Sequence, residues 1–242
     1  MTDPSKWRAY LDDDSLFDQK VPYSFSTIIP KLKIAAEKPD HINPYFALSP
    51  IYDFTKVFGI ISSALGMGFN DITSKVNQVR RKFKEYPKCN DVQEILIEEI
   101  KMGINRCNGD NNEKLGFGQG PYKKYTSCSR IFLRLLWFME YLVTIFGKIL
   151  KDNGNSGIKG ILGSSYDEVL APHHKWIVRQ AVNIAMALPG GGDVKNFIKI
   201  VFERDNYDDE AKKLVQETKD LLEKILKGGY DFYKKTNMMD LE

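Results

Sequence analysis

Cysteine is scarce in this sequence, and its few thiols form no recognisable framework. The 242 residues include three cysteines, Cys89, Cys107 and Cys128, which are odd in number, widely spaced and outside any CxxC pattern. Such a set indicates neither a disulfide scaffold nor a zinc site. We therefore expect reduced thiols in a cytoplasmic protein, and no bound metal.

A strong excess of one charge is also missing. Lysine and arginine total 35, and aspartate and glutamate total 32, which leaves a formal net charge of +3. This balance does not give the broad basic field on which nucleic-acid binding depends. We expect no nucleic-acid partner, and a small anion or a membrane surface matches this charge better.

The sequence shows neither a signal peptide nor a convincing membrane span. Residues 1–16 are acidic and have no apolar centre of the kind that signal peptides contain. The best candidate span, residues 129–150, is interrupted by Arg134, Glu140 and Lys148. A charge near the centre of a span costs roughly 2.5 to 3.5 kcal/mol. We therefore interpret this stretch as a core helix of a soluble protein.

Apolar residues recur at helical spacing along most of the chain, and the alternating pattern of strands is missing. Length and even composition favour a single domain over residues 1–242, in which residues 1–20 form an N-terminal extension of unclear role. The sequence therefore predicts an all-α protein. Breaks rich in glycine, asparagine and proline separate the expected helices, which are Ser24–Ala36, Pro44–Gly66, Asp71–Tyr86, Asp91–Asn105, Tyr122–Asp152, Ser165–Leu188, Asp193–Phe202 and Asp208–Lys235.

Two arginines interrupt the most apolar of these helices. Arg130 and Arg134 are four residues apart, so their guanidinium groups lie on one helix face and repel each other unless an anion joins them. One interpretation is structural, with Glu140 or another acidic residue neutralising Arg134. The other is a bound phosphate or carboxylate, which suits the planar set of guanidinium donors.

Two further polar pairs give little sign of catalysis. Asp71 and Lys75 are also four residues apart, a spacing that by itself describes an ordinary exposed ion pair. His173 and His174 are adjacent, so on a helix they point about 100° apart and do not chelate one metal together. No serine or cysteine stands in a known nucleophile motif. We expect no enzymatic activity.

Three short blocks follow one another in an order that carries a family likeness. They are D-x-x-x-K at Asp71–Lys75, R-x-x-x-R-L at Arg130–Leu135 and H-x-W-x-V-R at His174–Arg179. The sequence ALP at residues 187–189 and the C-terminal NMMDLE add to the likeness. Together these blocks resemble the glycolipid transfer protein superfamily, and within it the ceramide-1-phosphate transfer branch.

The resemblance implies a fold and a function. The implied fold is a two-layer helical sandwich that encloses an apolar pocket for hydrocarbon chains. The implied function is movement of ceramide-1-phosphate between membranes, with the lipid chemically unchanged and no cofactor. We expect a cytoplasmic monomer whose association with membrane surfaces is peripheral and transient.

The resemblance also implies roles for residues that match the family's motifs. Asp71 and His174 would bind the ceramide amide. Trp176 would contact the membrane, where an amphipathic ring is favourable. The lipid phosphate would be held by Lys75, Arg130 and Arg134.

A choice of register decides the headgroup. In the glycolipid-binding branch a tryptophan in a leucine-rich string stacks on the sugar, and LLWF with Trp137 is similar to that string. This register leaves both arginines unmatched, whereas the phosphate register matches Arg130 and Arg134 and makes Trp137 a core residue. Glycosphingolipid transfer therefore remains an alternative.

Some segments depart from the family pattern. The loops at residues 108–121 and 153–165 look longer than in typical members, and residues 1–20 have no clear counterpart. These segments are candidate contact surfaces for other proteins. A sphingolipid sensor or adaptor is therefore a second alternative.

Overall fold

The fold is built from helices throughout the part of the chain that the computed structural model describes, residues 3–117, 120–152, 154, 156–187 and 191–241. The β-type pairing found there is two isolated bridges, Asn108 with Thr126 and Gly157 with Asp193. The all-α prediction is confirmed. The α-helices are α1 Trp7–Asp12, α2 Ile28–Glu37, α3 Pro44–Ile61, α4 Ser63–Gly68, α5 Asn70–Glu85, α6 Val92–Lys101, α7 Cys128–Lys151, α8 Ile158–Val169, α9 Trp176–Ala187, α10 Val194–Phe202 and α11 Asp209–Lys235.

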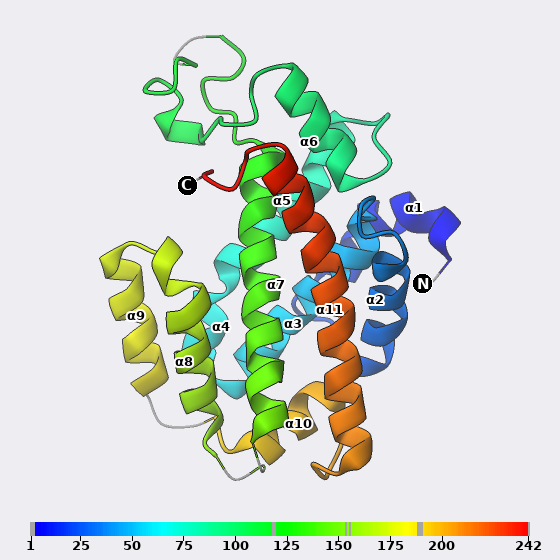
Figure 1. Cartoon of the computed structure of the whole chain (residues 1–242), viewed down its shortest axis with the longest axis vertical. Helices are drawn as coiled ribbons and strands as arrows, with labels where there is room; N and C mark the ends of the chain where they lie inside the picture. The colour runs from blue at the N-terminus through cyan, green and yellow to red at the C-terminus, as the bar shows by residue number, and fades with distance from the viewer. Residues whose placement is uncertain (1–2, 118–119, 153, 155, 188–190, 242) are drawn as a thin grey trace.

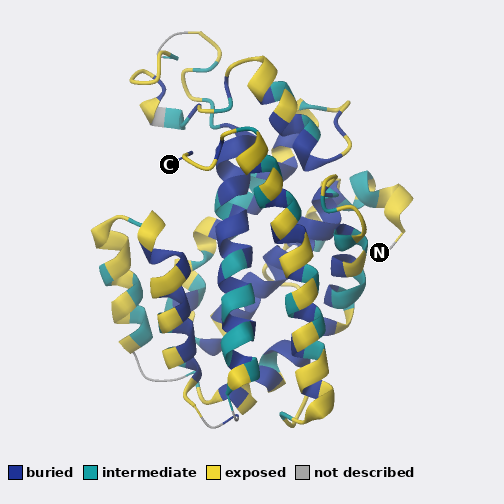
Figure 2. Cartoon of the chain, in the orientation of Figure 1, coloured by how far each residue is buried: buried dark blue, intermediate teal, exposed yellow. Residues whose placement is uncertain are grey.

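Helix α7 runs through the middle of the molecule, and the other long helices form two layers around it. In Figure 1, α8 and α11 flank α7 in the layer nearer the viewer, with α9 outside α8, and α3, α4 and α5 lie behind. Burial follows this arrangement, because the ribbon is buried where the layers meet (Figure 2). From Cys128 to Met139 every residue of α7 is buried except Arg134.

The helix predicted over Pro44–Gly66 is interrupted near its end. Helix α3 stops at Ile61, Ser62 is extended with φ −162° and ψ 132°, and α4 starts at Ser63. Two glycines meet at this turn, since a Cβ on Gly66 would lie 2.7 Å from the Cα of Gly59. The close approach redirects the chain, so that α4 packs beside α9 instead of continuing α3.

The helix predicted over Ser165–Leu188 is wrong, because the structure divides this segment. Helix α8 already begins at Ile158, within a predicted loop, and ends at Val169. A short 3-10 helix, Ala171–His173, follows with Pro172 in its first turn, and His174 is extended before α9 begins. Pro172 has no N–H to donate to the preceding turn, and its ring clashes with the carbonyl four residues earlier, so α8 cannot continue through it. The predicted end at Leu188 and the predicted loop residue Asn153 lie outside the described residues.

The described part of the N-terminal segment, residues 3–20, packs on the core through a few side chains. Leu11 and Phe17 are buried. The buried Arg80 of α5 donates from Nε to the Leu11 carbonyl at 2.8 Å, and its guanidinium lies 3.9 Å from the centre of the Phe17 ring. This segment is therefore anchored to the helices that carry the candidate site.

The start of α7 is fixed by a buried carboxylate, and not at the predicted residue Tyr122. Ser127 caps α7, and the completely buried Glu99 of α6 accepts hydrogen bonds from the backbone N–H of Cys128 at 2.5 Å and of Ser129 at 2.8 Å. The Ser129 hydroxyl and the Tyr125 phenol also donate to Glu99. These bonds satisfy donors that a helix N-terminus leaves open, and they position the helix that carries Arg130 and Arg134.

We expect Glu99→Ala to lower the free energy of unfolding by about 3 kcal/mol or more, because two backbone donors lose a charged acceptor. Chemical denaturation followed by circular dichroism measures the change. Glu98→Ala on the same helix is the matched control, since Glu98 makes a surface ion pair with Lys101 and should cost less than about 1 kcal/mol. Equal losses in the two variants would contradict the assigned role of Glu99.

Candidate functional site

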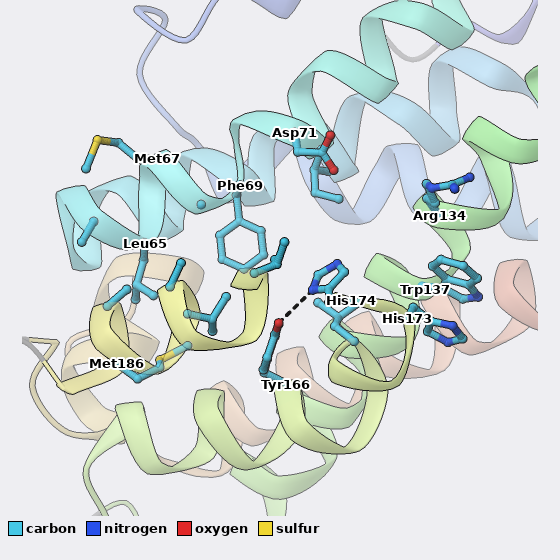
Figure 3. Close-up of a pocket in the computed structure, with 18 of the residues that line it drawn as sticks. Leu65, Met67, Phe69, Asp71, Arg134, Trp137, Tyr166, His173, His174 and Met186 are labelled. Carbon is cyan, nitrogen blue, oxygen red and sulfur yellow. Dashed lines mark hydrogen bonds between the residues drawn. The ribbon is translucent and has the colours of Figure 1, made fainter. Parts of the chain in front are cut away.

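A cavity of about 460 Å³ opens between α4, α5, α7, α8 and α9. Figure 3 shows that one end is polar, with Asp71, Arg134 and His174, and that the other end is apolar, with Leu65, Met67 and Met186. The apolar wall also includes Phe69, Ile72, Val178, Ala181, Val182 and Ala185. A cavity with convergent polar groups at one end and hydrocarbon walls at the other suits an amphipathic ligand.

Arg134 is the charged residue of α7 that reaches this cavity. Its Nη1 donates to the carbonyl of Arg130 at 2.9 Å. Among the described residues, no carboxylate lies within ion-pair distance of Arg134, and Glu140 instead accepts a hydrogen bond from Tyr230 of α11. Burial lowers the pKa of Arg134, and the negative charge of Asp71 partly opposes that shift. The ion pair between Glu140 and Arg134 that the sequence left open is therefore not formed.

Asp71 and Lys75 lie on α5 at the polar end of the cavity, one turn apart. The Lys75 ammonium donates a hydrogen bond to the Asp71 carboxylate. The lysine side chain is mostly covered, whereas the aspartate side chain is exposed. An ion pair with one member in water contributes little to stability, so both groups are available to a ligand at small cost.

His174 is held in place by a partner that the sequence analysis missed, Tyr166 of α8. The Nδ1 atom of His174 lies 2.8 Å from the Tyr166 hydroxyl oxygen. Burial raises the pKa of Tyr166 to about 12, so the phenol keeps its proton at neutral pH and can donate it to Nδ1. The imidazole proton is then on Nε2. The sequence does place Tyr166 eight residues before His174. This spacing predicts contact between the two side chains only when the chain is known to turn at Pro172.

A parallel aromatic pair forms the wall beside Arg134. The rings of Trp137 and His173 stack with centroids 3.6 Å apart and an interplanar angle of 4°. Trp137 is 9% exposed and belongs to the core, as expected, but it also lines the cavity. Its position there was not predicted.

The structure therefore brings together four of the six residues selected from the sequence. Asp71, Lys75, Arg134 and His174 all line the cavity. Arg130 is buried and is not among the lining residues. Trp176, also outside the lining, is 65% exposed at the start of α9.

Aromatic side chains close the inner side of the cavity. Phe69, at the junction of α4 and α5, stacks on the buried Phe58 with ring centroids 4.2 Å apart. Phe138 and Tyr141 of α7 also contact this pair. Phe69 therefore connects the cavity wall to the buried aromatic cluster between the two layers.

None of the described helices is long and apolar enough to cross a membrane. The three cysteines are buried free thiols. In the same described part of the chain, no group of three or more histidine, cysteine, aspartate or glutamate side chains is arranged to hold a metal ion.

Comparison with known sequences identifies a family. The model of the glycolipid transfer protein family matches residues 47–203. The chain is 33% identical to Accelerated cell death 11 of Arabidopsis thaliana over 78 residues, and 28% identical to the ceramide-1-phosphate transfer protein of Danio rerio over 116 residues. These matches cover 32% and 48% of this chain, and 38% and 53% of the two relatives.

A solved structure supports the predicted architecture. Human ceramide-1-phosphate transfer protein in complex with 2:0 ceramide-1-phosphate superposes with a TM-score of 0.74 at 14% sequence identity. The superposition covers 91% of this chain and 99% of that one. The prediction of a helical sandwich of this type is confirmed.

The environment of His174 makes stability depend on pH. Burial lowers the pKa of His174 from 6.5 in the folded protein. The neutral imidazole therefore contributes its full stabilisation at pH values above the pKa of the unfolded state, and this stabilisation is lost as the pH falls through the pKa of the folded state. We expect the free energy of unfolding to fall more steeply in the native chain than in His174→Asn between about pH 7.5 and about pH 5.5. Urea denaturation at each pH measures both.

The asparagine variant keeps a polar group that can bond to Tyr166. His41, whose pKa is raised by its hydrogen bond to Asp91, acts in the opposite direction but equally in both proteins. Identical pH profiles would contradict the assigned environment of His174.

Proposed function

The chain belongs to the glycolipid transfer protein family, and on that premise we propose that it moves ceramide-1-phosphate between membranes. The family is one of lipid transfer proteins and not of enzymes, so the lipid leaves as it entered. One observation carries the choice of headgroup, the half-buried Arg134 that faces the cavity without a carboxylate partner among the described residues.

The phosphate binds at Arg134 and Lys75 in this proposal. A desolvated guanidinium gains more from an anion than an exposed one does, and its planar donors suit two phosphate oxygens. Lys75 reaches the same end of the cavity from α5. Arg130, one turn before Arg134 and buried, is the proposed third cation, and its contact with the phosphate stays a prediction.

The amide is recognised by Asp71 and His174. When the phosphate attracts the Lys75 ammonium, the Asp71 carboxylate is released to accept hydrogen bonds from the ceramide N–H and hydroxyl. The proton on Nε2 of His174, placed there by Tyr166, donates to the amide carbonyl. Phosphatidic acid has the phosphate but no amide, so this pair is the proposed basis for rejecting it.

The hydrocarbon chains enter the apolar end of the cavity. A ceramide carries on the order of 25 methylenes, and each costs about 0.8 kcal/mol in water. Two chains need more than the present cavity of about 460 Å³. None of the described residues of α9 is buried, so this helix can move away from α4 at little cost in core packing.

The start of α9 is the proposed membrane contact. Trp176 is 65% exposed and the adjacent Ile177 is 66% exposed. Exposed apolar side chains of this size favour the interface between water and lipid. They lie on the helix that forms one wall of the cavity, so docking here would bring the cavity to the bilayer.

The first test is Arg134→Leu in a vesicle assay with fluorescent ceramide-1-phosphate. Loss of a charge-assisted contact of about 1.5 to 3 kcal/mol should weaken lipid binding about 10- to 100-fold, and transfer should slow by a similar factor. Circular dichroism should be unchanged, because leucine suits the apolar surroundings of α7.

Arg106→Leu is the matched control for the loss of an arginine. Arg106 is exposed and paired with Asp240, so this variant should transfer like the native protein. Native transfer rates in folded Arg134→Leu would refute the proposed phosphate site.

The second test is Trp176→Ala. We expect its partition onto lipid vesicles to weaken about tenfold, because one large apolar side chain no longer enters the interface. Binding of a short-chain, water-dispersed ceramide-1-phosphate should remain, since Trp176 does not line the cavity. Vesicle sedimentation and calorimetry measure the two quantities.

Leu115→Ala is the matched control for the loss of exposed apolar surface. Leu115 is exposed in the loop before α7 and should leave partition unchanged. Equal partition of Trp176→Ala and the native protein would exclude Trp176 from the membrane contact.

A further inference from the structure

One face of the Trp137 indole in the headgroup cavity is covered by the His173 ring. Figure 3 shows Trp137 between Arg134 on one side and His173 on the other. The Arg134 guanidinium lies over the indole at 5.8 Å from the ring centroid, and the His173 ring is parallel to it at 3.6 Å. The imidazole is therefore in direct contact with one face of Trp137, whereas the guanidinium lies near the ring without stacking on it.

The flat face of an indole is a binding surface for a sugar ring. The face carries partial negative charge, and the axial C–H groups of a hexose carry partial positive charge. A tryptophan that lines a lipid headgroup cavity would therefore stabilise a neutral sugar if one face were free. In this chain His173 occupies the face opposite Arg134.

We propose that His173 determines headgroup selectivity by covering the sugar-binding face of Trp137. The inference rests on the proposed function and adds the class of lipid that is rejected, the neutral hexosylceramides. Hexosylceramides contain the same ceramide amide that Asp71 and His174 bind in the proposal, so the amide site alone does not exclude them. Without this cover, the same cavity would accept a sugar as well as a phosphate.

The backbone holds His173 in its covering position. The residue ends the 3-10 helix Ala171–His173, directly after Pro172, whose ring restricts the backbone. Its N–H donates to the carbonyl of Leu170 at 3.0 Å. On the other side, His174 is bonded to Tyr166. The stack is therefore built by the same break in the chain that presents His174 to the cavity.

Removing the imidazole should expose the indole without opening the core. His173 is itself exposed, so its truncation leaves no buried cavity to collapse. The space released lies beside the polar end of the cavity, over the face of Trp137. The group that we expect to occupy it is a single hexose ring on a ceramide.

The experiment measures transfer of galactosylceramide and ceramide-1-phosphate between vesicles, in parallel, for the native chain and His173→Ala. The reported quantity is the ratio of the two transfer rates. We expect the ratio of galactosylceramide to ceramide-1-phosphate to rise about fivefold or more in the variant, the gain that one aromatic stacking contact provides.

Two matched variants isolate the role of the aromatic cover. His173→Phe keeps a flat ring over Trp137 and should retain the native ratio. The double variant His173→Ala, Trp137→Leu removes both the cover and the platform, and should lose the gain of the single variant. Circular dichroism verifies that each protein is folded.

The outcomes separate this inference from the proposed function. Failure of the native chain to move ceramide-1-phosphate would overturn the proposed function. If the native chain and His173→Ala both move ceramide-1-phosphate with the same ratio of rates, His173 is not the selector. A raised ratio that persists after Trp137→Leu would also overturn the inference, because the sugar would then be bound elsewhere.

Discussion

The burial of α7 is the constraint on which the rest of the structure depends. This helix is buried from Cys128 to Met139 except at the half-buried Arg134, and moving a guanidinium out of water is costly unless polar groups surround it. A cavity opens at that residue, and Asp71 and Lys75 of α5 line the same cavity. A polar site at the edge of an apolar sandwich follows directly, and with it the capacity to hold an amphipathic molecule.

The polar end of the cavity is organised so that its groups bind one another when no ligand is present. Lys75 bonds to Asp71, Arg134 bonds to the carbonyl of Arg130, and His174 bonds to Tyr166. A carrier must release its lipid, and internal partners of this kind reduce the cost of an empty site. At the apolar end the wall formed by α9 has no buried side chain among its described residues, and the proposed entry of the lipid separates this helix from α4.

Sequence reasoning found the helical class, because helical periodicity is a local signal, and the family resemblance selected Asp71, Lys75, Arg134 and His174, which the structure brings to one cavity. It failed where a few residues redirect the chain. Pro172 divides a segment that reads as one helix, and the approach of Gly59 to Gly66 separates α4 from α3. Tyr166 and the stack of His173 on Trp137 depend on these breaks, so periodicity did not reveal them. Arg130 lies four residues before Arg134 on α7, as the sequence motif requires, but it does not line the cavity.

The most direct test of the central claim is a crystal structure of this chain in complex with ceramide-1-phosphate. The account predicts phosphate oxygens within hydrogen-bond distance of Arg134 and Lys75, the amide N–H bonded to Asp71, and the ion pair between Asp71 and Lys75 opened. It also predicts hydrocarbon between α4 and α9. A lipid bound with its phosphate away from Arg134, or with the amide contacting neither Asp71 nor His174, would contradict it.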